Sequence, residues 1–403
     1  MKRAPPLGPE LRRMIWPLSR EEFLRRHFQS RHFVSHAPAR RVQPILDALR
    51  ISSVEDYLRR RDQDLKVQVW YQTREGDYAV VETAPRDALG LYRAGLTVYI
   101  NAVHELAEWK TILGRQLGYE DAGSPSLFGA RRGGGTRWHF DWLENFTVQL
   151  QGTKTWRVAP NRQVPLPMEN WVTRQAVSDA MRAYVPDALP REAPPEEVET
   201  VRLRPGSMLY LPRGYWHTAE ASTGDSLSVT FLYPPAAWVT RLLPGLRERL
   251  TALPAWREHA TELHGDRRDV GKARAKVEVL LAQLREVVGQ LRPEDLVPAE
   301  AGTAPRVGAR TRLRRNPLAF LNVGPASEAG TRAVQIEVQS LRPQRFDLEI
   351  EPELAPVCLF VVRREASFLA SEAAAAARRV PFARAAGLLR VLLEAGVLQQ
   401  DGK

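Results

Sequence analysis

Cysteine is almost absent from this 403-residue chain, which contains a single one, Cys358. One cysteine cannot form an intrachain disulfide, and it cannot supply a zinc ribbon, which needs several thiolates. A chain without disulfides fits a reducing compartment. We therefore expect a cytoplasmic protein whose fold depends on packing rather than on cross-links.

Long hydrophobic runs are also missing. No apolar segment reaches the roughly 18 residues that a membrane-spanning helix requires. The first residues, Met-Lys-Arg-Ala-Pro-Pro, lead into no apolar signal-peptide core. These two absences predict a protein that has no membrane partner.

Lysine is scarce, because only 7 of the 58 basic residues are lysines and the rest are arginines. The net charge of +11 is spread over both halves of the chain. A diffuse excess of this kind attracts acidic partners without specificity, so it leaves association with nucleic acid or the ribosome open. We expect the one dense basic run, residues 310–315, to be a solvated part of a linker spanning about residues 299–317.

The pattern of short segments predicts a mainly β core in residues 1–238. Hydrophobic residues make up 44% of the chain, which suffices for packed cores, and its length predicts two or three domains. Turn residues separate the β-like segments, and one amphipathic helix is expected at residues 103–117. Such a series favours a double-stranded β-helix of the cupin or jelly-roll type. The segments are 65–70, 96–100, 136–141, 146–150, 155–159, 207–211 and 226–233.

Three further regions complete the expected architecture. Residues 161–198 form an insertion rich in Pro and Glu, with a helical stretch near 172–184, which we interpret as a functional lip or an interface. Residues 239–300 are expected to be helical and to form a homodimer through one apolar stripe. Short strands and a final helix in residues 301–403 resemble a winged-helix domain. The stripe consists of Leu280, Leu281, Leu284, Val287 and Val288.

The motif with the clearest chemistry is His139-x-Asp141. On a strand, residues i and i+2 point to the same side, so the imidazole and the carboxylate would be presented together. A second segment, Gly214-Tyr-Trp-His217, follows another expected strand and adds a histidine. Two histidines and one carboxylate form the facial triad of non-haem Fe(II) oxygenases, which leaves coordination positions free for substrate and O2.

Lys154 and Thr136 extend this constellation. Lys154 directly precedes the expected strand 155–159, and Trp156 of that strand has the same parity, which places the lysine in the barrel wall. A buried lysine is unfavourable without an anion, and its natural partner is a carboxylate of a bound cosubstrate. Thr136, three residues before His139, can add a hydroxyl to the same anion.

In order and rough spacing these residues resemble the JmjC/cupin 2-oxoglutarate oxygenases, in the branch of the asparaginyl hydroxylases and ribosomal oxygenases. The motifs that carry the resemblance are His139-x-Asp141, Asn145, Gly152-x-Lys154, Pro205-Gly206, Leu211-Pro212 and Trp216-His217. The resemblance covers about residues 10–240 and extends more weakly to the C-terminal regions.

The resemblance implies His139, Asp141 and His217 as Fe(II) ligands and Lys154 as the partner of the distal carboxylate of 2-oxoglutarate. Thr136 and Tyr99 would hydrogen-bond nearby, and Asn145 would line the same pocket. The implied reaction uses O2 and converts 2-oxoglutarate to succinate and CO2 while a side chain of a protein or peptide, preferably a ribosomal protein, is hydroxylated. Asp141 occupies the position that a halide would need, which favours hydroxylation over halogenation. Bacterial members often have Arg where Lys154 stands.

Two alternatives remain open from the sequence. The substrate could be a small or ribosomally made peptide metabolite, because nothing in residues 161–198 defines the groove. The chain could also be a non-catalytic cupin-type regulator that binds nucleic acid through its winged-helix-like C-terminal region. Consumption of the cosubstrate distinguishes the second alternative from an oxygenase.

Overall fold

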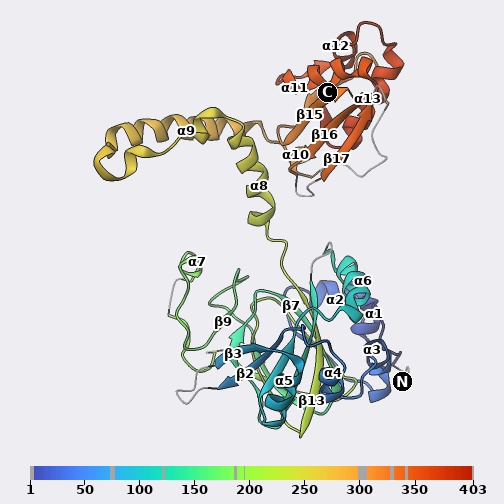
Figure 1. The fold of residues 1–403 in the computed structure, drawn as a ribbon, viewed down its shortest axis with the longest axis vertical. Coiled ribbons are helices and arrows are strands. Elements are labelled where there is room, and N and C mark those ends of the chain that lie inside the picture. Colours follow the sequence, from blue (N-terminus) through green and yellow to red (C-terminus); the bar gives the residue numbers. More distant parts are fainter. Residues whose placement is uncertain are drawn as a thin grey trace. The chain divides into compact units, whose positions relative to one another are not determined.

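A computed structural model describes residues 4–72, 78–119, 123–185, 188–194, 196–297, 306–326, 331–340 and 344–401. The chain divides into two compact units, Met1–Pro235 and Ala236–Lys403 (Figure 1). The division into three regions at residues 238 and 300 stays a prediction. No helix within the described residues is long and apolar enough to span a membrane.

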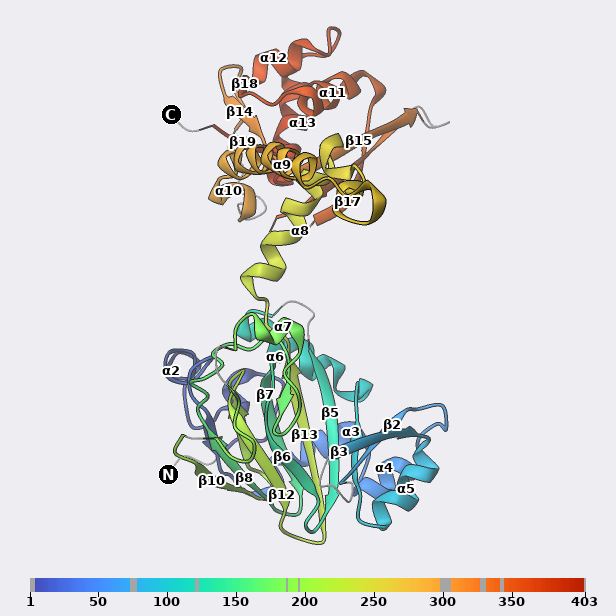
Figure 2. The ribbon, with the colours of Figure 1, turned by 90° about the vertical axis from the view of Figure 1, so that its left-hand side faces the viewer.

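Two antiparallel sheets form the core of the first unit, as expected for the jelly-roll type (Figure 2). Each of the seven predicted β segments overlaps a strand. In spatial order the larger sheet contains β1 (Phe33–Ser35), β11 (Met208–Leu211), β7 (Glu144–Gln151), β13 (Asp225–Tyr233), β5 (Ser124–Arg131), β4 (Thr97–Ile100), β2 (Val67–Gln72) and β3 (Tyr78–Thr83). The smaller sheet contains β10 (Glu199–Leu203), β8 (Lys154–Ala159), β12 (Trp216–Ala221), β6 (Gly135–Phe140) and β9 (Trp171–Val172).

Helices cover the outer face of the larger sheet. The N-terminus of α2 is capped, because the Ser19 hydroxyl accepts a hydrogen bond of 3.1 Å from the Glu22 amide. The predicted helix at 103–117 begins as a short 3-10 turn and continues as α6, which ends where Gly118 adopts a left-handed φ of 86°. The helices are α1 (Leu11–Met14), α2 (Arg20–Arg26), α3 (Gln43–Leu49), α4 (Val54–Arg59), α5 (Pro85–Arg93) and α6 (Ala107–Leu117).

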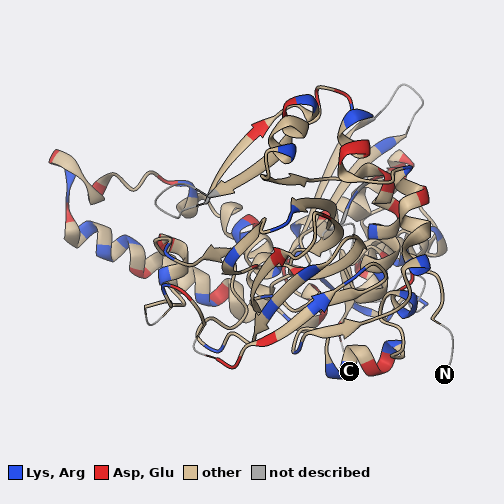
Figure 3. Ribbon diagram, turned by 90° about the horizontal axis from the view of Figure 1, so that it is seen from below, with Lys and Arg blue, Asp and Glu red and all other residues tan. Residues whose placement is uncertain are grey.

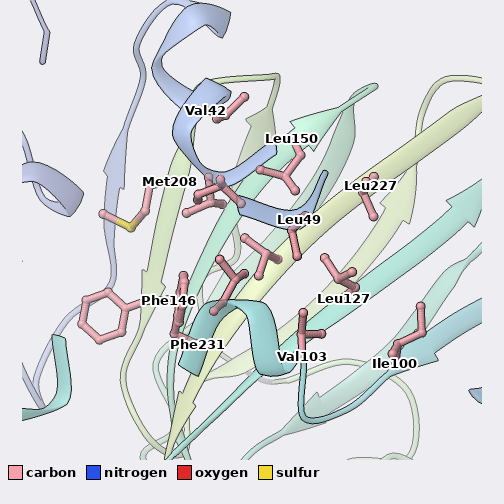
Figure 4. Close-up of a cluster of buried hydrophobic side chains, with 14 of the residues drawn as sticks. Val42, Leu49, Ile100, Val103, Leu127, Phe146, Leu150, Met208, Leu227 and Phe231 are labelled. Carbon is pink, nitrogen blue, oxygen red and sulfur yellow. The ribbon is translucent and has the colours of Figure 1, made fainter. Parts of the chain in front are cut away.

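Strand β7 separates the main hydrophobic core from the interior of the barrel. Phe146, Val148 and Leu150 belong to the core beneath the helices, where Phe231 of β13 also lies (Figure 4). The alternating residues Asn145, Thr147 and Gln149 are buried as well, although they are polar. A strand buried on both faces with polar residues on one of them indicates a polar interior between the sheets.

The insertion at residues 161–198 differs from its prediction. The only helix among its described residues is the short α7 (Asp179–Arg182), and Trp171 and Val172 form β9 instead of beginning a helix. These two residues pair with Phe140 and His139 at the edge of the smaller sheet, and the Trp171 ring packs on Phe140 and Trp216. Sheet pairing and aromatic burial thus override the helical pattern.

The second unit contains helices α8 (Trp238–Thr251), α9 (Val270–Gln290) and α10 (Pro293–Leu296), followed by a small mixed domain with its own core. One sheet consists of β18 (Phe368–Leu369), β14 (Arg312–Arg315) and β19 (Leu398–Gln400). The other consists of β15 (Ala319–Ala326), β16 (Arg332–Val338) and β17 (Gln344–Ile350). Helices α11 (Ala355–Arg363), α12 (Ala370–Ala375) and α13 (Phe382–Glu394) complete it. The winged-helix assignment of residues 301–403 stays a prediction.

The basic run at residues 310–315 is not the solvated linker that we expected. Residues 298–305 of that linker lie outside the described residues, but Arg312–Arg315 form β14. Arg314 is only 8% exposed and pairs with the buried Asp295 at 2.7 Å. The prediction failed because Leu313 and its strand partners, and not charge, determine the local structure. Other basic positions are distributed over helices and strands of both units (Figure 3).

Candidate active site

His139, Asp141 and His217 lie together at one cavity of about 310 Å³ that both sheets of the first unit line. One ligand atom from each residue lies within 4.8 Å of the others. Strand register produces this arrangement, because His139 of β6 is directly opposite His217 of β12. Their ring centroids are 4.0 Å apart, and His217 Nε2 is 3.5 Å from Asp141 Oδ2. Three donors converging in this way fit a single transition-metal ion with open positions.

Both imidazoles are oriented by backbone carbonyls. Nδ1 of His139 lies 2.7 Å from the Arg137 carbonyl, and Nδ1 of His217 lies 2.9 Å from the Tyr215 carbonyl. A carbonyl only accepts, so each Nδ1 carries the proton and each Nε2 offers its lone pair. This outer hydrogen bond fixes the tautomer in the way that is usual for metal-binding histidines.

The protonation states also suit metal binding. Burial and the neighbouring His217 ring lower the pKa of His139 to about 4, so this ring is neutral at physiological pH. Burial by itself would raise the pKa of Asp141, but the contact with His217 and the proximity of both rings hold it below its ordinary value. The site therefore offers the neutral imidazole of His139, the imidazole of His217 and one carboxylate, the donor set of the facial triad.

Lys154 is buried in the same cavity, as the parity of β8 predicts. It is 4% exposed, and its Nζ donates a hydrogen bond of 3.2 Å to the Ser228 hydroxyl of β13. The Phe128 ring centroid lies 5.5 Å from Nζ, and in the part of the chain that the structure describes no carboxylate pairs with it. Burial lowers the pKa of Lys154 to about 8. A buried cation without a protein counter-charge is a site for an anionic ligand.

Thr136, Tyr99 and Asn145 also line this cavity, so the structure brings all seven predicted residues together. Thr136 Oγ1 accepts a hydrogen bond of 3.3 Å from the Ala219 amide. Tyr99 exchanges a hydrogen bond of 3.0 Å with Ser126, and burial raises the pKa of its hydroxyl. Asn145 Oδ1 accepts a bond of 2.8 Å from the Thr147 hydroxyl. What these three residues bind stays a prediction.

Sequence reasoning missed several residues of the cavity wall. Trp70 of β2 and Phe128 of β5 form an aromatic cluster with Tyr99, with ring centroids 4.6–5.9 Å apart. Asn170 and Val172 enter from the insertion, and Asn170 is held by a hydrogen bond of 2.9 Å from the Trp142 amide. No motif marks these positions. The pairing of β9 with β6 was the missing information, since it places the insertion in the wall.

Comparison with known proteins gives two matches to family models. A JmjC domain model matches residues 122–239, a range that includes every predicted site residue except Tyr99. An AraC-like ligand-binding domain model matches residues 197–306.

Similar proteins cover the chain to different extents. The chain is 28% identical to YxbC of Bacillus subtilis (strain 168) over 304 residues, which are 72% of this chain and 91% of YxbC. It is 32% identical to ribosomal oxygenase 1 of Bos taurus over 151 residues, so the match spans 36% of this chain and one fifth (20%) of that longer protein. Among solved structures, Escherichia coli YcfD, named a ribosomal oxygenase in complex with cobalt and 2-oxoglutarate, aligns with 96% of this chain and 99% of its own at 15% identity and a TM-score of 0.42.

Proposed function

We propose that this chain, whose residues 122–239 match a JmjC domain model, is a 2-oxoglutarate oxygenase that hydroxylates a side chain of a ribosomal protein. The enzyme uses Fe(II), 2-oxoglutarate and O2. Together these supply an oxidant strong enough to attack a C–H bond, with release of succinate and CO2. In this assignment His139, Asp141 and His217 hold the iron.

The observation that carries the proposal is a buried lysine without a counter-charge in the same cavity as the three metal-ligating side chains. Lys154 takes the distal carboxylate of 2-oxoglutarate, which supplies the missing anion. Thr136 and Tyr99 add hydroxyl groups, and Asn145 adds an amide. Asp141 would give the iron a carboxylate ligand, which favours hydroxylation over halogenation.

The ribosomal substrate is supported by two relatives named ribosomal oxygenase 1, which are 32% and 31% identical to this chain over 151 residues. The cavity wall gives further support for a polypeptide, because the aromatic cluster of Trp70, Tyr99 and Phe128 and the insertion residues Asn170 and Val172 surround the metal centre with mostly apolar surface. A wall of this kind suits a single side chain that enters from a larger partner.

The test is a comparison of ribosomes. Ribosomal proteins from a strain that lacks this gene serve as substrate for the purified protein with Fe(II) and 2-oxoglutarate. We expect release of succinate and the gain of one oxygen atom in one ribosomal protein, measured by intact mass. Succinate release with only a biosynthetic peptide would favour the peptide-metabolite alternative, and no binding of 2-oxoglutarate would refute the oxygenase.

We further propose that α8 and α9 form a homodimer. Leu280, Leu284 and Val287 of the predicted stripe are partly or fully buried within the second unit. Other apolar side chains on the two helices remain 42–70% exposed, which is unusual for a chain that acts alone. They are Trp238, Val239, Leu243, Val270, Val277, Val279, Leu281 and Val288.

A further inference from the structure

A chain of buried hydrogen bonds lies behind Asn145 on the inner face of the larger sheet. Thr147 of β7 and Thr230 of β13 are directly opposite each other in the strand register, and their hydroxyl oxygens are 2.9 Å apart. Thr147 is fully buried and Thr230 is 2% exposed. The Thr147 hydroxyl is also 2.8 Å from Asn145 Oδ1. Three polar side chains are thus joined in one row.

The number of protons on each group determines which side chain donates in each hydrogen bond of this row. A carboxamide oxygen only accepts, so the single proton of the Thr147 hydroxyl is donated to Asn145 Oδ1. Thr230 must then donate its proton to Thr147. Asn145 itself is 6% exposed and lines the cavity, and within the described residues its Nδ2 donates to no protein acceptor. The amide therefore presents its N–H groups to the cavity.

The position of Asn145 relative to the metal-ligating residues and to Lys154 indicates which part of a bound ligand its amide faces. Asn145 of β7 pairs with Leu211 of β11. The turn that follows Leu211 contains Gly214, whose amide donates a hydrogen bond of 2.7 Å to the Asp141 carbonyl. Asn145 therefore lies at the end of β7 that is near the metal-ligating residues. Lys154 contacts Ser228, two residues before Thr230 on β13 and on the same side of that strand. Asn145 itself is opposite Leu232, four residues along β13 from Ser228, so Asn145 and Ser228 are about 13 Å apart along the strand direction.

We infer that Thr147 is a positioning residue that holds the Asn145 amide with its nitrogen toward the metal-proximal carboxylate of the cosubstrate. This inference rests on the proposed function. Without the Thr147 hydroxyl, the amide can rotate and present its oxygen to the anion. Rotation exchanges an attractive contact for a repulsive one, without any change in the three metal ligands.

The test measures binding and not turnover. The full-length protein is loaded with Mn(II), and 2-oxoglutarate is titrated by calorimetry. Thr147→Val is expected to weaken 2-oxoglutarate binding roughly tenfold or more, the usual effect of a hydrogen bond to a charged group. Thr147→Ser, which keeps the hydroxyl, is expected to stay within about twofold, and Mn(II) affinity by electron paramagnetic resonance should be the same in all variants.

A double-mutant cycle separates positioning from loss of structure. If Thr147 acts through Asn145, then Thr147→Val has no further effect on 2-oxoglutarate binding in an Asn145→Ala background. The inference would be overturned if Thr147→Val weakened 2-oxoglutarate binding equally in the wild-type and Asn145→Ala backgrounds, or if folded Thr147→Val bound 2-oxoglutarate as wild type does. In either case, binding of 2-oxoglutarate by the wild-type protein would still support the oxygenase. Failure of the wild-type Mn(II) protein to bind 2-oxoglutarate would instead refute the proposed function and the inference together.

Discussion

Thr136 and His139 face the same cavity although they are three positions apart on one strand. Simple alternation would place them on opposite faces of β6. Opposite β12, however, Thr136 is paired with Ala219 and His139 with His217, so three steps on β6 match two steps on β12. This β-bulge reverses the parity between the two residues. It allows β6 and the residue after it to supply a hydroxyl and the two predicted metal ligands, His139 and Asp141, to one site.

Replacement of Asp141 by alanine is expected to remove metal binding without unfolding the first unit. The variant keeps both histidines but loses the only carboxylate of the triad. We expect Mn(II) affinity to fall by more than about 100-fold, since even outer hydrogen-bond partners of metal ligands are typically worth 10–100-fold. Electron paramagnetic resonance measures the binding, and Glu220→Gln, an exposed carboxylate of the same sheet, is the control. Retained affinity in Asp141→Ala would contradict the ligand assignment.

Lys154→Met should abolish 2-oxoglutarate binding and yet stabilise the ligand-free protein at pH 7. Burial lowers the pKa of Lys154 from 10.5 to about 8, so between these values the unfolded chain binds more protons and the folded state gains stability as pH rises. At pH 7 the buried cation is destabilising by roughly 1–3 kcal/mol, which methionine avoids. Urea unfolding at pH 7 and pH 10 checks the sign. The advantage of the variant should shrink at the higher pH, and a variant less stable at pH 7 would refute the prediction.

We expect the buried Glu144 to cause a second pH dependence of stability, with a sign opposite to that caused by Lys154. Burial raises its pKa from 4.5 to about 7, although the Tyr210 hydroxyl donates a hydrogen bond to it. The folded state therefore binds the extra proton, and this contribution to stability is complete below pH 4.5 and is lost as pH rises to about 7. Glu144→Gln keeps an acceptor for Tyr210 and removes the charge. Denaturation across pH 5–8 should show a flatter profile for this variant than for wild type or for Glu220→Gln.

Gly135→Ala is expected to disrupt the active site through the backbone. A Cβ at this position would lie 1.9 Å from the carbonyl oxygen of Ala219, so β6 and β12 could not keep their register. We expect a loss of about 3 kcal/mol in unfolding free energy together with weaker metal binding, because the same register aligns the two histidines. Gly90→Ala on α5 is the control, since its Cβ would meet nothing within 4 Å. Normal metal binding in Gly135→Ala would show that the register tolerates the change.

The proposed dimer can be tested on the exposed face of α9. Leu281→Glu places a charge on that face, where Val277 and Val288 are also exposed, and should produce monomers at micromolar concentration in light scattering. Ala282→Glu, on a neighbouring face of the same helix, should leave the mass unchanged. A monomeric wild-type protein would refute the dimer and leave the oxygenase proposal intact.

Much of the catalytic core follows from local sequence patterns. Short β-like segments separated by turn residues predicted the seven strands, and the spacing of His139 and Asp141 predicted two ligands on one face. Lys154 could be assigned to the interior because Trp156 shares its parity. These features depend only on the period of a strand and on the chemistry of side chains, and the local sequence determines both.

Only the tertiary structure decided the remainder. The bulge that turns Thr136 toward His139, the pairing that brings His217 opposite His139, and the entry of Asn170 and Val172 into the wall all depend on strands far apart in the sequence. The tertiary structure also decided the role of Arg314: its local sequence predicts a solvated charge, but Arg314 pairs with the buried Asp295. The sequence by itself determined which chemical groups the site contains. The register between strands determined which of them meet, because register depends on long-range packing that no local pattern encodes.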